Sequence, residues 1–393
     1  MTRPLRVGMI GYGFMGKAHS NAYKQVAHFF PELELRPELS VLCARDKDKA
    51  ASFAKTWGYK NVVSDWRELV QRDDVDIIDI GAPNHIHKDI ALAAAAAGKM
   101  VVCEKPLAMN VEEAEEMAAA VEAAGVPNMV WYNYRRVPAI ALSKQVVDEG
   151  RIGKQFHYRA TYLQDWTIAA DVPQGGAGLW RLDVDVAGSG VTGDLLAHSI
   201  DTAMWLAGPI TKVVADTETF VKERMHQETG KLQKVGIDDA CSVLVRFASG
   251  AMGVFESTRY ARGRKNYNTF ELNGADGSVR FDLEDPQYLD FFEYTDKRSG
   301  SKVDDHLTGW RKVHVTNPEH PYMDHWWVPG CTIGYEHTFI HALADFLKAA
   351  DKGTNTQPDF RSALQTQRVC DAILASSKSG GWVETGVEPD AVR

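Results

Sequence analysis

The sequence has few of the features that mark secreted, membrane or nucleic-acid-binding proteins. Its 393 residues include only five cysteines, which are scattered and show no CxxC spacing. This argues against a disulfide framework or a cysteine-bound metal, and we expect reduced thiols in a cytoplasmic protein. No apolar run reaches the roughly 18 residues of a membrane span, and residues 1–4 lead into a predicted strand without a signal-peptide core. The net charge of −9 argues against nucleic acid as a partner.

The length and composition are those of a globular protein with two domains. A chain of 393 residues exceeds what one hydrophobic core usually organises. Apolar residues make up 45% and charged residues 25%, which are ordinary globular values. The period of the apolar pattern changes after Arg136, so we predict one domain at residues 1–135 and a second at 136–393.

The first domain alternates predicted strands and helices. A strand at residues 5–10 runs into Gly11-Tyr12-Gly13-Phe14-Met15-Gly16, and a helix follows at 17–26. Further strands are predicted at 39–43, 76–80, 100–103 and 129–132, and further helices at 47–57, 65–72, 84–97 (capped by Asn84) and 111–124. This alternation predicts an α/β Rossmann domain with a doubly wound parallel sheet. A GxGxxG turn between strand and helix predicts a bound dinucleotide. Residues 28–38, with two prolines, are predicted to form an ordered loop.

The residues after the second predicted strand bear on the choice of cofactor. An acidic side chain usually stands there and accepts hydrogen bonds from the adenosine ribose. Here the position holds Ala44, followed by Arg45. A guanidinium can fork onto a 2′-phosphate, so the pattern slightly favours NADP over NAD. Two alternatives stay open: Arg45 as a solvated surface charge, and Asp46 turned inward to bind the ribose of NAD.

The second domain has the pattern of an α+β structure. A helix is predicted at 138–148, and strands at 155–164, 212–221, 239–247, 251–259, 268–272 and 278–282. These predict a large, open, mostly antiparallel sheet with one face on helices of its own domain. The other face needs a cover, which predicts a homodimer or homotetramer. A loop is predicted at 310–330, followed by a helix at 332–349 from which Tyr335 and His337 would reach the ligand.

Two groups of polar residues are the candidates for chemistry. Lys105 follows the predicted strand at 100–103, at the end where ligands bind in such sheets. Asp194, His198 and Asp201 share one face of a helix predicted at 194–207. A histidine between carboxylates is a ready proton acceptor near neutral pH. Aspartate and histidine also bind metals, but no further ligand is evident at helical spacing, so we predict no metal centre.

The chain resembles the glucose–fructose oxidoreductase, inositol dehydrogenase and rhizopine-catabolism (Gfo/Idh/MocA) family over nearly its whole length. The resemblance rests on the GxGxxG turn, Ala82-Pro83-Asn84-His85-Ile86-His87, Glu104-Lys105-Pro106 and Gly193-Asp194-Leu195-Leu196-Ala197-His198. It implies that Lys105, Asp194 and His198 form the catalytic set. It also implies cofactor contacts, which would come from Gly11, Gly13, Phe14, Met15, Gly16, Pro83, His87, Glu104, Lys105 and Asn133.

Further segments resemble the branch of this family that comprises levoglucosan and related pyranoside dehydrogenases. These segments are Asn133-Tyr134-Arg135-Arg136, Tyr162-Leu163-Gln164-Asp165-Trp166 and Leu179-Trp180-Arg181. The resemblance implies that Trp180 and Arg181 meet the cofactor. With Tyr335 added, the substrate-binding set comprises Lys105, Tyr134, Gln164, Trp166, Asp194, His198 and Tyr335. A tryptophan and paired polar groups suit a pyranose, which has an apolar ring face and a rim of hydroxyls.

We therefore expect an NAD(P)-dependent dehydrogenase that oxidises a ring hydroxyl of a pyranose, anhydrosugar or cyclic polyol, or reduces the keto sugar. His198 would accept the hydroxyl proton, Asp194 would orient His198, and Lys105 would polarise the oxygen. Two other classes stay open. One is an NAD-dependent glycosidase or lyase that oxidises its sugar transiently, and the other is a non-catalytic dinucleotide sensor.

Overall fold

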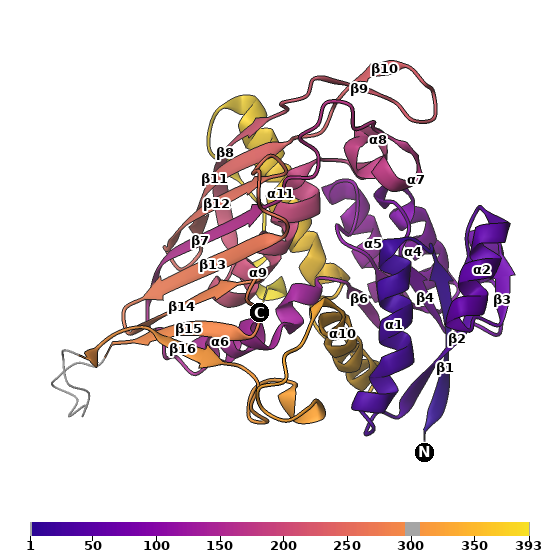
Figure 1. Ribbon diagram of the computed structural model, residues 1–393, viewed down its shortest axis with the longest axis horizontal. Coiled ribbons are helices and arrows are strands. Elements are labelled where there is room, and N and C mark those ends of the chain that lie inside the picture. Colours follow the sequence, from indigo (N-terminus) through magenta and orange to yellow (C-terminus); the bar gives the residue numbers. More distant parts are fainter. Residues whose placement is uncertain (1, 295–306, 393) are drawn as a thin grey trace. The chain divides into compact units, whose positions relative to one another are not determined.

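The computed structural model describes residues 2–294 and 307–392, which form two compact units (Figure 1). Unit 1 consists of residues 2–136, Asp185–Gly188 and Gly334–Gln367. Unit 2 consists of Val137–Val184, of the described part of Ser189–Ile333, and of residues 368–392. The first segment ends next to the predicted boundary at 135. The two later segments of unit 1 are not anticipated by a single boundary.

Unit 1 is built on a six-stranded parallel sheet in the order β3-β2-β1-β4-β5-β6. Its strands are β1 (Arg3–Ile10), β2 (Leu35–Cys43), β3 (Asn61–Val63), β4 (Ile77–Ile80), β5 (Met100–Cys103) and β6 (Asn128–Val130). The strands are apolar on both faces because helices cover both sides of such a sheet. The order reverses between β1 and β4, so the predicted doubly wound α/β fold is confirmed.

The helices of unit 1 follow the predicted pattern: those at 47–57 and 111–124 have the predicted ends, and the others have shifted ends. They are α1 (Phe14–Phe29), α2 (Lys47–Trp57), α3 (Trp66–Val70), α4 (His87–Ala96), α5 (Val111–Ala124) and α10 (Tyr335–Ala350). The predicted loop at 28–38 was wrong at both ends, because buried Phe30, Leu33 and Leu35 hold α1 and β2 close together. Asn84 does not cap α4. It lies in the single turn η1 (Asn84–Ile86), and its side chain donates to the Ala187 carbonyl at 2.9 Å.

The segment Gly334–Gln367 completes unit 1 late in the chain. Its helix α10 packs along α1, where Lys348 pairs with Glu32 at 2.8 Å and the rings of His341 and Phe30 meet edge to face. After α10 the chain runs past the outer strand β6, and the Val130 N–H donates to the Pro358 carbonyl at 2.8 Å. The edge of the parallel sheet is thereby covered.

Unit 2 contains a nine-stranded sheet in the order β16-β15-β14-β13-β7-β12-β11-β8-β17. Its strands are β7 (Gln155–Leu163), β8 (Ile210–Glu218), β11 (Ala240–Phe247), β12 (Met252–Thr258), β13 (Tyr267–Gly274), β14 (Gly277–Asp282), β15 (Tyr288–Glu293), β16 (Arg311–His314) and β17 (Val383–Glu384). Within the described part of this nine-stranded sheet, only the central pair β7–β12 is parallel. The mostly antiparallel α+β sheet is therefore confirmed. A separate ribbon is formed by β9 (Glu223–Met225) and β10 (Leu232–Lys234).

The predicted loop at 310–330 was wrong at its beginning, where β16 extends the sheet. His314 stacks on Tyr288 with ring centroids 4.7 Å apart, and Lys312 pairs with Asp285 at 2.8 Å. These cross-strand pairs hold β16 on β15 although its own four residues are poor in strand formers. Further along the same stretch, the single turn η7 (Met323–His325) forms.

Helices cover one face of the unit 2 sheet, among them α6 (Pro138–Asp148) and α9 (Ala197–Ala207) (Figure 1). Shorter elements are α7 (Gly176–Leu179), η3 (Trp180–Leu182), η4 (Thr192–Leu196), the boundary helix α8 (Val184–Ala187) and the terminal turn η8 (Pro389–Ala391). The helix α11 (Phe360–Ser379) begins in unit 1 and ends in unit 2. The predicted helix at 194–207 begins as the π-helical turn η4 before it continues as α9.

Candidate active site

The glycine turn of unit 1 has the shape that a pyrophosphate requires. Gly11 has φ +103°, and a Cβ there would lie 2.6 Å from the Gly81 carbonyl oxygen. A Cβ on Gly16 would lie 2.4 Å from the Gly11 oxygen, so helix and strand pack too closely for a side chain. Gly13, in contrast, faces open space. None of the described side chains caps α1, and its first turn carries no acidic residue, so its N–H groups and dipole fit a bound phosphate.

The residues after β2 are arranged by the start of α2. Asp46 is the N-cap of this helix: its Oδ1 accepts the Lys49 N–H at 3.1 Å, and its Oδ2 lies 3.1 Å from Lys49 Nζ. Aspartate is a favoured N-cap residue, which accounts for its place in the sequence. Arg45 is exposed and Ala44 is half-buried. The carboxylate of Asp46 is thus engaged by its own helix.

Lys105 is half-buried and directly follows the buried Glu104 at the end of β5. The loop after it is held by His87, a predicted cofactor contact. The fully buried ring of His87 has Nε2 at 2.9 Å from the Ala82 oxygen and Nδ1 at 3.2 Å from the Pro106 oxygen. Burial lowers the pKa of His87, so its ring is neutral at neutral pH. In this structure the ring braces the lysine loop.

Two other predicted cofactor residues, Asn133 and Pro83, lie in the segments that follow β6 and β4. The buried Asn133 donates from Nδ2 to Thr338 Oγ1 at 2.7 Å, which ties the turn after β6 to α10. Pro83 is half-buried and stands at the start of η1.

Exposed aromatic rings lie at the beginning of α1. Phe14 is 66% exposed and stacks on Tyr335, with centroids 5.9 Å apart and planes at 17°. Tyr134 meets the edge of Tyr335 at 6.3 Å. A predicted cofactor residue and two predicted substrate residues are therefore neighbours in unit 1. The Nδ1 of His337 accepts the Gly334 N–H at 3.0 Å and closes the first turn of α10.

Sequence reasoning missed a buried cluster of ionisable groups in unit 1. His19 of α1 lies between Asp79 of β4, at 3.1 Å, and Glu104, at 2.9 Å. Burial by itself would lower the pKa of His19, but the two carboxylates outweigh it and raise the pKa to about 9. The signal for this cluster was present in the sequence. An aspartate in the middle of the apolar run Ile77–Ile80 must have a partner when the strand is buried.

In unit 2, the turn that carries Asp194 is anchored from behind by Asp238. The Asp238 carboxylate accepts the Gly190 N–H at 2.6 Å, and the Thr192 N–H and hydroxyl at 2.8 and 2.7 Å. Thr192 begins this turn, η4, which is π-helical, a geometry that is frequent at functional sites. Asp238 thus fixes the backbone that directly precedes Asp194, and His198 follows one helical turn later.

Asp194 accepts hydrogen bonds from two arginines. Arg181 Nε donates to Asp194 Oδ1 at 3.3 Å, and Arg259 Nη2 donates to Oδ2 at 2.6 Å. Arg259 is fully buried, and sequence reasoning did not identify it. His198 follows one turn later, is 6% exposed, and has its ring 6.1 Å from that of Tyr162.

A polar network joins the predicted sugar-binding residues of unit 2. Trp166 is 40% exposed, and its Nε1 donates to Gln164 Oε1 at 2.9 Å. Gln164 Nε2 and the Tyr162 hydroxyl both donate to Asn266 Oδ1, at 3.1 and 2.7 Å. The Arg259 guanidinium lies 5.3 Å from the Trp166 ring. The guanidinium of Arg181 lies 4.4 Å from the ring of Trp180. Three separate sequence motifs are therefore brought together within this unit.

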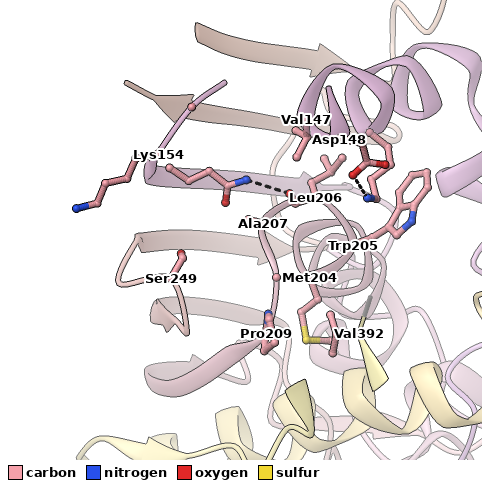
Figure 2. Close-up of a pocket in the computed structure, with 14 residues that line it drawn as sticks. Val147, Asp148, Lys154, Met204, Trp205, Leu206, Ala207, Pro209, Ser249 and Val392 are labelled. Atoms are coloured by element: carbon pink, nitrogen blue, oxygen red, sulfur yellow. Dashed lines mark hydrogen bonds and ion pairs between the residues drawn. The ribbon is translucent and has the colours of Figure 1, made fainter. Parts of the chain in front are cut away.

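A pocket of about 580 Å³ lies at the C-terminal end of α9, away from His198 near its N-terminal end (Figure 2). Of the residues that line it, Gln155 donates from Nε2 to the Leu206 oxygen at 3.2 Å, and Lys144 pairs with Asp148. None of the predicted site residues lines it. The lining comes from the ends of secondary-structure elements: Lys144, Val147, Asp148, Gly153, Lys154, Gln155, Met204, Trp205, Leu206, Ala207, Gly208, Pro209, Ser249 and Val392.

Residues 2–294 and 307–392 contain neither a group of metal ligands nor a membrane-spanning helix. Within these ranges, no three histidine, cysteine or acidic side chains are grouped so that they could hold a metal ion. Over the same residues, every helix is too short or too polar to span a membrane.

Two family models match most of the chain. The model of the oxidoreductase family with an NAD-binding Rossmann fold matches residues 5–133, and that of the GFO/IDH/MocA C-terminal domain matches 140–280. Levoglucosan dehydrogenase of Pseudarthrobacter phenanthrenivorans is 39% identical over 393 residues, which cover 97% of this chain and 98% of that protein.

Solved structures agree with these matches. An oxidoreductase domain protein from Kribbella flavida is 45% identical, with a TM-score of 0.91 over 98% of this chain and all of that one. Levoglucosan dehydrogenase in complex with NADH and levoglucosan is 40% identical, with a TM-score of 0.91 over 97% of this chain and 99% of that one. With a relative of this identity matched along almost its whole length, and with both family models in the expected order, the chain belongs to the Gfo/Idh/MocA family of oxidoreductases.

Proposed function

We propose that this protein is an NAD(P)-dependent dehydrogenase that oxidises a ring hydroxyl of a pyranose, an anhydrosugar or a cyclic polyol, or reduces the corresponding keto sugar. The proposal rests on the group around Asp194 in unit 2. There the exposed Trp166 ring offers an apolar platform, and Gln164 and Asp194 offer hydrogen-bonding groups beside it. A relative with 39% identity is a levoglucosan dehydrogenase, which supports a sugar of this class.

In the proposed reaction, His198 accepts the proton of the hydroxyl group whose carbon is oxidised. A positioned general base contributes about 10²–10⁴-fold to the rate. Lys105 donates a hydrogen bond to the same oxygen and stabilises the negative charge that develops on it. Asp194, held by Arg181 and Arg259, accepts hydrogen bonds from neighbouring hydroxyls and orients His198. The nicotinamide, when bound, supplies the hydride acceptor.

The cofactor would be held by the glycine turn and the loops that follow β4, β5 and β6. Gly13 leaves space for the pyrophosphate, and Phe14, Met15, Pro83 and Asn133 border that end of the sheet. We assign Glu104 and Lys105 of unit 1, and Trp180 and Arg181 of unit 2, to the same ligand because of the motifs that they share with the family.

We further propose that NADP binds more tightly than NAD. Ala44 provides no carboxylate for the ribose, Asp46 is engaged as the N-cap of α2, and the exposed Arg45 side chain is available for a 2′-phosphate. The solved levoglucosan dehydrogenase complex contains NADH, and this similarity favours NAD instead. Direct binding measurements with both dinucleotides decide between them.

The outer face of the unit 2 sheet supports the proposal of a homodimer or homotetramer. On this face Leu244 lies between Val214 and Val254 in the strand register, and Met252 follows on β12. Leu244 is 43% exposed, and Val254 and Met252 are each 40% exposed. Charges of both signs surround them, which suits a face that pairs with its own copy: Arg159, Lys212, Asp216, Arg246, Glu256 and Glu271.

Light scattering at micromolar concentration tests this assembly. We expect Leu244→Glu to reduce the mass of the wild-type assembly. Leu232→Glu, at an exposed position on the β10 ribbon, should leave it unchanged. A monomeric wild type would contradict the proposal.

All five cysteines are free, and four of them are buried, as expected for reduced thiols in the proposed cytoplasmic location.

A screen of pyranoses, anhydrosugars and inositols with NAD+ and NADP+, followed at 340 nm, tests the proposed activity. We expect at least one sugar to reduce the dinucleotide in the wild type, and Lys105→Met to lower kcat strongly. Lys24→Met is a matched control, because it removes a lysine of α1 outside the proposed site. A tightly retained cofactor with no net absorbance change on any sugar would instead favour the transient-oxidation glycosidase or lyase.

A further inference from the structure

The cluster of His19, Asp79 and Glu104 joins three elements of unit 1 that are far apart in the sequence. His19 and Asp79 are fully buried, and Glu104 is 5% exposed. The two ring nitrogens of His19 lie 3.1 Å from Asp79 Oδ1 and 2.9 Å from Glu104 Oε1. Trp131 stacks on the His19 ring at 4.3 Å, and its Nε1 donates to the same Asp79 oxygen at 3.3 Å. Helix α1, strand β4 and the end of β5 thus meet at one imidazole.

Because the cluster is buried, its stability depends on whether His19 carries a proton. Two carboxylates in an apolar interior are costly unless a cation and hydrogen bonds compensate them. Burial acts to lower the pKa of His19, but Asp79 and Glu104 raise it to about 9, so the ring carries a proton at neutral pH and donates to both. Of the nearby groups, Tyr23 and Cys103 stay neutral, because burial and the same carboxylates raise their pKa values. Phe339, 5.6 Å from the His19 ring, closes another side.

The cluster reaches the catalytic loop through the second oxygen of Glu104. Glu104 Oε2 accepts the backbone N–H of Lys105 at 3.1 Å, while Oε1 is held by His19. On the far side of the loop, His87 lies against the carbonyls of Pro106 and Leu107, each at 3.2 Å. Glu104 therefore holds the backbone N–H of Lys105, and His87 holds the carbonyls of the two residues that follow it.

We propose that His19 is a positioning residue for the reaction: through Glu104 it fixes the backbone of Lys105 and thereby sets where the lysine amine is presented. This inference rests on the function proposed above for Lys105. Asp79 has a supporting role, because it holds the other nitrogen of His19 and so directs the ring at Glu104. The helix that follows the dinucleotide turn is in this way connected to the residue that meets the sugar oxygen.

A test that needs no substrate follows the Lys105 amine by NMR. Lysines are reductively dimethylated with ¹³C-formaldehyde and a borane reductant, and the Lys105 signal is identified by its absence from Lys105→Met. We expect His19→Gln, whose amide can bond a carboxylate but carries no charge, to change the chemical shift and titration midpoint of that signal. Arg6→Gln is the matched control, since it breaks the 2.6 Å ion pair with Asp76, which lies just before the amino end of β4, whereas Asp79 lies towards the carboxyl end of that strand. An unchanged Lys105 signal in folded His19→Gln would overturn the proposal.

The kinetic test uses levoglucosan with NAD+ and NADP+. A misplaced catalytic group can cost up to about 10²-fold, so we expect a 10- to 100-fold loss of kcat in His19→Gln with little change in KM. If His19 acts through Lys105, adding His19→Gln to Lys105→Met should produce no further loss. The wild-type rate should also fall as the pH rises through 9, and this step should be missing in His19→Gln.

The outcomes separate the two proposals. Wild-type turnover in Lys105→Met would refute the function of Lys105. An inactive Lys105→Met together with a fully active His19→Gln, or additive losses in the double variant, would refute only the positioning role. If His19→Gln does not fold, Asp79→Asn takes its place, because it keeps the shape and an oxygen acceptor while it removes one charge. If levoglucosan is not oxidised, the NMR experiment decides.

Discussion

Raising the pH from 6.5 to 9 should destabilise unit 1, because His19 loses the proton that holds its two carboxylates. The ordinary pKa of histidine is about 6.5, which applies to the unfolded chain, whereas the folded value is about 9. A group with a raised folded pKa contributes its full stabilisation below the unfolded pKa and loses it as the pH rises through the folded one. The difference corresponds to about 3 kcal/mol in the free energy of unfolding, at 1.36 kcal/mol for each pKa unit.

The other ionisable groups of unit 1 whose pKa values are shifted change the free energy of unfolding mainly outside the range from pH 6.5 to 9. Burial lowers the pKa of His87, so that residue destabilises the fold only when the pH falls below about 6.5. Burial raises the pKa of the Cys43 thiol to about 12 and that of Tyr59 in the same direction. These groups cost stability where their counterparts in the unfolded chain ionise, so the thiol contributes at the upper end of this window and the tyrosine above it. Stability should therefore be greatest near pH 6.5.

Guanidinium unfolding of the wild type and of His19→Gln, at steps between pH 6.5 and 9, measures the effect. The relevant transition is the one that bound dinucleotide shifts, since that transition reports on unit 1. We expect the wild-type free energy of unfolding to fall by about 3 kcal/mol across the range, and the variant to show a nearly flat profile. Parallel profiles for the two proteins would show that His19 is not protonated in the folded state, and the reasoning would be refuted.

Three further predictions concern the proposed catalytic and cofactor-binding residues. His198→Ala should lower kcat by about 10²–10⁴-fold with unchanged dinucleotide affinity, measured by steady-state kinetics and fluorescence titration; wild-type turnover would remove His198 from the reaction. Arg259→Met should lower kcat/KM about 10- to 150-fold, because it removes a charged hydrogen bond to Asp194 worth about 1.5–3 kcal/mol. The surface control Arg264→Met should leave kcat/KM unchanged, and an equal loss there would contradict the assignment. Arg45→Ala should weaken NADP binding by a similar factor, about 10- to 150-fold, and spare NAD in isothermal titration; NAD bound tenfold more tightly by the wild type would point to Asp46.

Local patterns in the sequence predict much of this fold. The strand, glycine turn and helix at residues 5–29 depend on neighbours in the chain, and so does the βα alternation up to residue 130. The motifs around Lys105 and Asp194 could be found for the same reason, because each is a short run with a fixed spacing.

Contacts between distant parts of the chain could not be predicted in this way. Asp79 stands out as a charge in an apolar strand, but its partner lies 60 residues earlier, and only the folded sheet brings it there. Arg259 lies 65 residues after Asp194 and looks in the sequence like one more charge at the end of a strand. Strand β16 is held by side-chain pairs with β15 rather than by its own residues, so its sequence alone reads as a loop.

The return of residues 334–367 to unit 1 means that the nucleotide-binding fold is not a separable module of the gene. A fragment ending at residue 136 would contain the whole parallel sheet and the glycine turn. It would lack Phe339, which shields the His19 ring, and Pro358, whose carbonyl pairs with Val130. During synthesis, the charged interior behind Lys105 cannot be sealed until about six-sevenths of the chain has left the ribosome, since Phe339 is residue 339 of 393. Domain exchange with a relative would therefore have to carry both stretches together.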